Sequence, residues 1–180
     1  MNSNAMEHPR RNPLRPYIWG LAAFLLILPG IAMQFTSEVD WNTADFVIFG
    51  VMLLVACGIY EAAPRFSGSM AYRLAVGLAV LAGFPIVWIN AAVGIIGNES
   101  NPANIMFYLI PLVALIASLL ARFKAPGMVR AMQITAIAQA STALIAVAMG
   151  WGHIWVLTAM FVAIWLTSAH LFNKASQDSH

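Results

Sequence analysis

The sequence has few charged residues, and long stretches have none. Only 9% of its 180 residues are Asp, Glu, Lys or Arg, whereas an ordinary soluble domain has about 25%. No charged residue occurs in 74–98, 100–121 or 131–173. So few charges could not cover the surface of a soluble fold, and uncharged apolar runs of about 18 or more residues are typical of membrane-spanning helices. The sequence therefore predicts an integral membrane protein.

Cysteine is almost absent as well. The single cysteine, Cys57, lies in an apolar stretch and has no second cysteine to pair with. This excludes a disulfide within the chain, a thiol redox pair and a four-cysteine zinc site. His153 and His170 fall at opposite ends of the last apolar stretch, too far apart to be axial ligands of one haem. These residues predict no metal site and no cofactor.

Apolar residues are abundant, and they occur in stretches of helical length. At about 1.5 Å rise per residue, roughly 20 residues cross the roughly 30 Å hydrocarbon layer. Helix caps and stops divide the chain between these stretches, notably Asn42 with Asp45, Gly97, Asn101-Pro102 and Pro126-Gly127. The predicted segments are a disordered basic tail (1–17), six spans and a polar tail (174–180). The six spans are 18–35, 43–62, 72–96, 102–123, 129–149 and 154–172. The expected fold is all-α, a membrane bundle of six helices arranged as three consecutive hairpins.

The first stretch has an alternative interpretation. A basic tail followed by an apolar segment also describes a signal peptide. The segment 18–35 is long for that purpose and has no convincing small-x-small cleavage site. We therefore predict that it is retained as a span, while its removal would leave five spans.

The basic residues predict the orientation. All nine lysines and arginines fall in the two tails, in the second and fourth connections, or at the span ends beside those connections. They are Arg10, Arg11, Arg15, Arg65, Arg73, Arg122, Lys124, Arg130 and Lys174. Basic residues near short loops stay on the cytoplasmic side. We expect both termini to be cytoplasmic. The pI near 9.0 then reflects topology rather than binding to nucleic acid.

Polar side chains gather toward the outer half of the expected bundle. Gln34 ends the first span, Asp45 begins the second, and Asn90 lies near the outer end of the third. Glu99 belongs to the following connection, and Asn104 lies at the beginning of the fourth span. These residues predict an outward-facing site that binds a small molecule or an ion. The alternative is that acids collect outside only because basic residues are held inside during membrane insertion.

Two rows of polar or small residues are spaced for one helix face each. The rows are Thr135, Gln139, Thr142 and Ala146 in the fifth span, and Ala75, Ala79 and Gly83 in the third. Helices in lipid pack through such small residues and through cross-helix hydrogen bonds worth about 0.6 kcal/mol each. We interpret the rows as packing faces, and the alternative is a hydrophilic path or a ligand site along the fifth span.

Two further patterns predict local contacts. Glu61 and Arg65 are four residues apart at the end of the second span, a spacing that favours an ion pair on the helix surface. The sequence also contains six tryptophans, several of them near span ends. These predict interfacial anchoring in the lipid bilayer.

Three stretches together resemble a group of small bacterial inner-membrane proteins to which no function is assigned. They are Met33-Gln-Phe-Thr-Ser-Glu-Val-Asp-Trp41 with Asp45-Phe46, Trp88-Ile-Asn90 through Asn101-Pro-Ala-Asn104, and Ala121-Arg-Phe-Lys-Ala-Pro-Gly-Met-Val-Arg130. The resemblance implies bacterial origin and inner-membrane location. It implies no activity, cofactor or catalytic residue.

Three functional hypotheses follow. The first is a binding or transport component with the outward-facing polar site. The second is a structural or assembly subunit, in which the small-residue rows dock helices of a second copy or of another membrane protein. The third is a membrane-embedded enzyme, which ranks last because no nucleophile-base pair and no two-carboxylate arrangement stands out.

Overall fold

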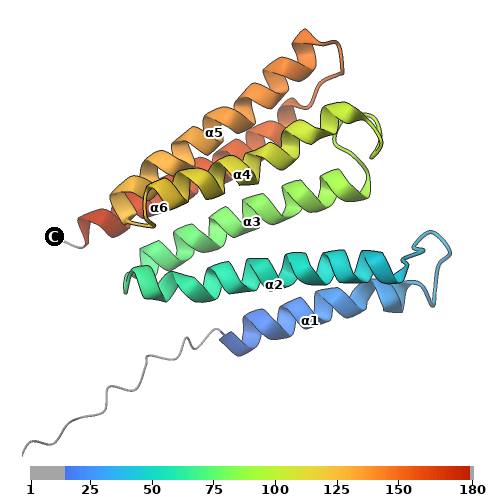
Figure 1. Cartoon of the computed structure of the whole chain (residues 1–180), viewed down its shortest axis with the longest axis horizontal. Helices are drawn as coiled ribbons and strands as arrows, with labels where there is room; N and C mark the ends of the chain where they lie inside the picture. Colours follow the sequence, from blue (N-terminus) through green and yellow to red (C-terminus); the bar gives the residue numbers. More distant parts are fainter. Residues whose placement is uncertain (1–14, 179–180) are drawn as a thin grey trace, which may run out of the picture. The chain divides into compact units, whose positions relative to one another are not determined.

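A computed structural model describes residues 15–178, which form six α-helices and one short 3₁₀-helix (Figure 1). The helices are α1 (Arg15–Ala32), α2 (Thr43–Phe66), α3 (Met70–Ala92), η1 (Pro102–Asn104), α4 (Ile105–Leu120), α5 (Ala125–Ala148) and α6 (Trp155–Gln177). Six helical segments, with η1 and α4 forming one, are long and apolar enough to cross a membrane, and their mean hydropathy lies between 1.5 and 2.2. No strand occurs in residues 15–178. For residues 15–178, the prediction of an all-α fold with six helices long and apolar enough to span a membrane is confirmed.

Several helix ends differ from the predicted span ends. α1 already begins at Arg15, α2 continues through Pro64 to Phe66, and α6 extends to Gln177. The first residues of the predicted C-terminal tail are therefore helical. Most of the predicted basic tail, with Arg10 and Arg11, lies outside the described residues.

The chain divides into two compact units, Met1–Glu61 and Ala62–His180. In the first unit, α1 and α2 contact each other where large side chains lie over glycines. A Cβ atom added to Gly30 would lie 3.6 Å from the Phe46 ring, and one added to Gly50 would lie 3.7 Å from Leu26. The contacts run in opposite directions along the two helices. The two helices are therefore antiparallel where they meet, with a large apolar side chain of one helix over a glycine of the other.

In the second unit, α3, α4, α5 and α6 run side by side (Figure 1). α3 packs against α4 and α6, and α5 packs against the same two helices, so the four helices form a closed ring. Large apolar side chains fill the interior. The largest that are fully buried are Trp165, Tyr72, Phe107, Phe161, Phe172, Ile86 and Met132.

Two turns of the second unit correct the predicted stops. α3 ends at Ala92, before the predicted stop at Gly97, because the chain already takes a left-handed conformation at Gly94, with φ 71°. The sequence predicts Pro126-Gly127 as the stop that ends the hairpin of the third and fourth spans, but Pro126 lies in the first turn of α5. Its missing N–H costs no intrahelical bond there. The reversal before α5 is made instead by Arg122 and Phe123, with φ 50° and 55°.

Candidate functional site

The predicted outward-facing site is divided between the two units. Gln34 and Asp45 belong to the unit Met1–Glu61, whereas Asn90, Glu99 and Asn104 belong to Ala62–His180. Each group is therefore considered within its own unit.

Gln34 and Asp45 have local contacts that stabilise helix ends. The Gln34 side chain is exposed, and its amide nitrogen lies 3.5 Å from the carbonyl oxygen of Gly30 one turn earlier. Asp45 accepts a hydrogen bond from the backbone N–H of Asn42 at 2.8 Å, and Asn42 in turn accepts one from Ala44 N–H at 2.7 Å. This reciprocal arrangement is a capping box. The prediction that Asn42 and Asp45 cap α2 is confirmed.

Asn104 organises the connection between α3 and α4. Its Oδ1 accepts hydrogen bonds from the backbone N–H groups of Ile95, at 3.2 Å, and Ile96, at 2.9 Å. Its Nδ2 donates to the carbonyl oxygens of Ile96, at 3.2 Å, and Asn98, at 2.7 Å. Asn104 is only 3% exposed. One amide side chain thus satisfies four backbone groups that no helix can satisfy.

Asn90 lies beneath this connection and is only partly satisfied. Its Nδ2 donates to the backbone oxygen of Asn104 at 2.9 Å, and the residue is 1% exposed. Its Oδ1 is buried and has no hydrogen-bond partner among the described residues. Glu99, by contrast, is exposed. The structure therefore brings Asn90 and Asn104 together, and leaves Glu99 on the surface of the connection.

The polar row of α5 faces the interior of the ring. Thr135, Gln139 and Thr142 are at most 3% exposed. The Thr135 hydroxyl donates to the Ala131 carbonyl oxygen at 2.8 Å, and the Thr142 hydroxyl donates to the Gln139 carbonyl oxygen at 2.7 Å, so both hydroxyl protons are used within α5. The side-chain Oε1 of Gln139 is buried and has no hydrogen-bond partner in residues 15–178.

Another unpaired polar atom lies on α6, in a residue that the sequence patterns did not single out. Trp165 is 1% exposed, and its indole Nε1 has no hydrogen-bond partner in the described part of the chain. The far edge of its ring lies 3.8 Å from a Cβ atom added to Gly83 of α3, and Pro111 of α4 is equally close to that position. We interpreted the tryptophans as interfacial anchors. The signal that could have found this residue is its place in the middle of a predicted span, where an indole N–H cannot reach the interface.

Gln139 and Trp165 lie at the same depth in the ring. Ala148, the last residue of α5, and Trp155, the first of α6, are joined by a short turn, and the two helices pack against each other. Gln139 is about 14 Å along α5 from Ala148, and Trp165 is about 15 Å along α6 from Trp155, given a rise of about 1.5 Å per residue. An unpaired acceptor and an unpaired donor are therefore buried at one level of neighbouring helices.

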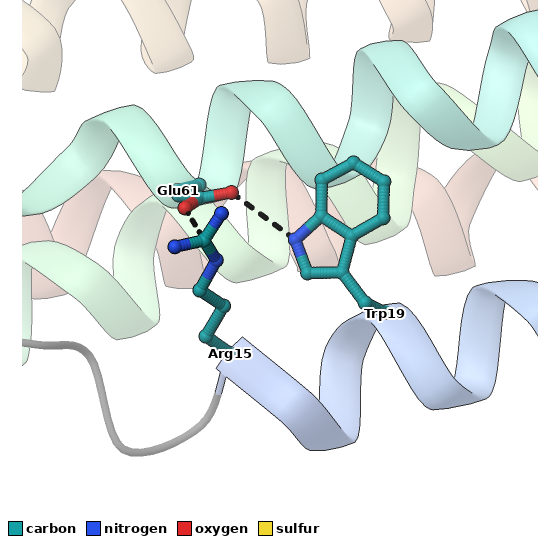
Figure 2. Close-up of polar contacts among 3 residues, drawn as sticks. All are labelled: Arg15, Trp19 and Glu61. Carbon is teal, nitrogen blue, oxygen red and sulfur yellow. Dashed lines mark hydrogen bonds and ion pairs between the residues drawn. The ribbon is translucent and has the colours of Figure 1, made fainter.

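A third polar group lies in the first unit and is fully paired. The Glu61 carboxylate is 2.9 Å from Arg15 Nε and accepts a hydrogen bond from the Trp19 indole at 3.1 Å (Figure 2). We expected an ion pair between Glu61 and Arg65 of the same helix, but the ion pair links Glu61 to α1 instead. Arg15, Pro16 and Trp19 line an open depression of about 520 Å³ beside it. This contact links the first two turns of α1 to Glu61 in the C-terminal part of α2.

The described residues contain no cluster of metal-ligating side chains. Residues 15–178 contain no group of three or more His, Cys, Asp or Glu side chains that could hold one. His153 and His170 are both exposed.

The comparisons with known proteins assign no family. No protein-family model matches the chain, and no significant match is found among curated proteins or solved structures.

Proposed function

We propose that this chain is a multi-pass protein of a bacterial inner membrane, with both termini in the cytoplasm and its spans arranged as three consecutive hairpins. The distribution of the nine lysines and arginines supports this orientation, because all of them fall on one side of the bundle when the spans alternate in direction. The resemblance to bacterial inner-membrane proteins supports the location.

Its proposed molecular role is to bind a small molecule within the ring of α3, α4, α5 and α6, as a binding or transport component. One observation carries the proposal, namely that Gln139 Oε1 and Trp165 Nε1 are buried without a partner at one depth. A buried polar atom that lacks a hydrogen bond costs about 1–3 kcal/mol. A leucine and a phenylalanine would fill such positions without that cost, so a bound molecule that satisfies both atoms offers a reason for these side chains.

The proposed site differs from the outward-facing group predicted from the sequence. Asp45 and Asn104 have structural hydrogen bonds, while Gln34 and Glu99 are exposed. Asn90 keeps an unpaired Oδ1 near the end of α3 that joins the α3–α4 connection. We assign to Asn90 a place between that connection and the deeper pair.

The assembly-subunit hypothesis is the competing proposal. In that hypothesis, helices of a partner dock on the small-residue rows of α3 and α5. The chain's own atoms, however, cover much of both rows. Ala75, Thr135 and Ala146 are each 0% exposed. A partner helix could not use those positions without displacing part of this chain. A membrane-embedded enzyme remains the third hypothesis, because no nucleophile-base pair and no two-carboxylate arrangement stands out among the described residues.

Native mass spectrometry of the protein released from mild detergent tests the binding role. We expect a stoichiometric non-lipid mass on the wild-type protein, and we expect it to be absent from Gln139→Leu. Gln133→Leu is the matched control, because Gln133 makes the same change on an exposed face of α5 and should keep the mass. A wild-type mass that equals chain plus lipid only, or a bound mass that survives in Gln139→Leu, contradicts the proposal.

A further inference from the structure

Basic side chains gather at one end of the second unit. The beginnings of α3 and α5 and the ends of α4 and α6 lie together at this end (Figure 1). Four exposed cations and one half-buried cation, Arg73, belong to it, and we call them the basic cluster: Arg65, Arg73, Arg122, Lys124 and Lys174. They come from α2, α3, the turn before α5, and α6, so only the folded chain brings them to one place.

Contacts among four aromatic residues hold these segments together. The Tyr72 hydroxyl donates to the Phe123 carbonyl oxygen at 2.7 Å, and the Tyr72 and Phe172 rings meet edge to face with centroids 5.1 Å apart. The ring centroids of Phe66 and Phe123 lie 4.6 Å apart. Each member of the basic cluster is one or two positions along the chain from one of these aromatic residues. The aromatic contacts therefore fix the backbone that carries all five cations.

The chain's own acids do not neutralise the basic cluster. The ion pair of the described residues joins Arg15 to Glu61, and no member of the cluster takes part in one within residues 15–178. From residue 62 to residue 178 the acids are Glu99, in the connection at the opposite end of the unit, and the exposed Asp178 after α6. The buried Nε of Arg73 also has no hydrogen-bond partner in the described residues. The cluster thus keeps a net positive charge that is open to an external anion.

Arg122 occupies a position that favours glycine. Its φ is 50°, in the left-handed region where a Cβ atom is unfavourable. The next residue, Phe123, has φ 55° but packs its side chain against the core. The Arg122 side chain is exposed and forms no ion pair within the described residues. A cation kept at such a position indicates a partner outside the chain.

The position of the basic cluster relative to the spans selects a lipid as that partner. Arg65, Arg73 and Lys174 lie in the last or first turns of helices that are long and apolar enough to cross a membrane, and the other two members lie between two such helices. The ends of membrane spans lie at the level of the lipid headgroups, and clusters of basic side chains there attract anionic lipids. Arginine in addition matches phosphate oxygens with its planar fork of N–H donors.

We propose that the basic cluster binds the phosphate group of an anionic phospholipid from the leaflet around this end of the unit. The inference rests on the proposed membrane location. It does not depend on the small-molecule site at Gln139 and Trp165, which lies in the interior of the ring.

Native mass spectrometry of the full-length protein, in detergent with equimolar phosphatidylglycerol and phosphatidylcholine of the same acyl chains, tests this inference. We expect the wild-type protein to prefer phosphatidylglycerol, the anionic lipid. Arg122→Gln should weaken this preference about fivefold, and Arg122→Gln combined with Lys124→Gln about 25-fold. Both side chains are exposed, so these changes leave the packing intact.

Two variants are controls. Arg15→Gln removes a cation that is already paired with Glu61 and should keep the preference. Arg122→Lys keeps the charge and the strained backbone position and should keep most of the preference. A loss in either control as large as that in Arg122→Gln contradicts the role of the basic cluster.

Other outcomes also overturn the inference. Equal binding of the two lipids by the wild-type protein shows that the cations recognise no anionic lipid. Displacement of phosphatidylglycerol by the same concentration of inorganic phosphate, or of a hexaglutamate peptide, assigns the cluster to a soluble anion instead. Gln139→Leu changes no residue of the cluster and should keep the preference, so failure of the small-molecule site leaves this test unaffected.

Discussion

Replacing Asn104 by alanine should loosen the connection between α3 and α4 more than any other single change of an amide in the chain. The substitution removes four side-chain hydrogen bonds, two accepted from Ile95 and Ile96 and two donated to Ile96 and Asn98. A net contribution of about 1 kcal/mol per bond gives about 4 kcal/mol. Water reaches the exposed Asn98 in the variant and offsets part of this, so we expect a loss of about 3 kcal/mol.

The assay is hydrogen-deuterium exchange of the peptide covering residues 93–104, followed by mass spectrometry. The amides of Ile95 and Ile96 are held only by the Asn104 side chain in this structure, so Asn104→Ala should accelerate their exchange about 100-fold, the factor that about 3 kcal/mol corresponds to. Asn104→Asp should behave similarly, because a carboxylate has no N–H₂ group to donate to the two carbonyl oxygens.

Asn98→Ala is the control for this prediction. Asn98 is exposed, and its side chain accepts only from Ser100, at 2.7 Å from the hydroxyl and 3.2 Å from the backbone nitrogen. Its loss should cost under about 1 kcal/mol. If the peptide exchanges equally fast in Asn104→Ala and Asn98→Ala, the reasoning about Asn104 is wrong.

Three other substitutions test separate contacts by unfolding in mixed micelles. Gly94→Ala should destabilise the chain by at least about 2 kcal/mol, because its Cβ would lie 2.3 Å from the Asn98 carbonyl. Gly150→Ala, with a similar φ of 69° and open space around it, should cost less, and equal losses would contradict the steric argument. Ser168→Ala removes a buried hydrogen bond of 2.8 Å to the Ala75 carbonyl and should cost about 0.6 kcal/mol, whereas Thr167→Ala, whose hydroxyl bonds within α6, should be neutral. Glu61→Gln should cost under about 1 kcal/mol, because Arg15 is 63% exposed, and high salt should reduce the difference from wild type; a larger, salt-independent loss would refute the surface ion pair.

Local sequence signals predicted the helices and several of their caps. Uncharged runs located the six spans, and Asn42 with Asp45 predicted the cap of α2. Asn101 followed by Pro102 predicted a helix start, and Asn101 Oδ1 does accept from Ala103 N–H at 3.0 Å, although the first turn is a 3₁₀-helix. These features depend on residues within one turn of each other, which a sequence displays directly.

Contacts between distant residues were not predictable in the same way. Glu61 has a basic residue four positions away, but the partner that it takes is Arg15, which precedes it by more than a helix and a connection. Asn104 looked like one more polar residue at the outer end of a span, since only the path of the folded connection brings four backbone groups to its amide. Pattern alone could not give either contact, because each depends on how two segments pack.

The two units differ in the kind of residue that they bury, and this difference bears on where function lies. All the buried polar residues in the described chain, Asn90, Asn104, Ser118, Thr135, Gln139, Thr142, Thr158 and Ser168, fall in Ala62–His180. α1 buries only Ala22 and Pro29. Most of these side chains bond to backbone atoms, and such bonds are weak in lipid. Gln139 and Trp165 each keep one buried polar atom without a partner in the described residues, as do Asn90 and Arg73. Leucine and phenylalanine would fill the positions of Gln139 and Trp165 without that cost. Packing therefore accounts for the helices of this bundle but not for these unpaired polar atoms, and they are where we look for a functional explanation.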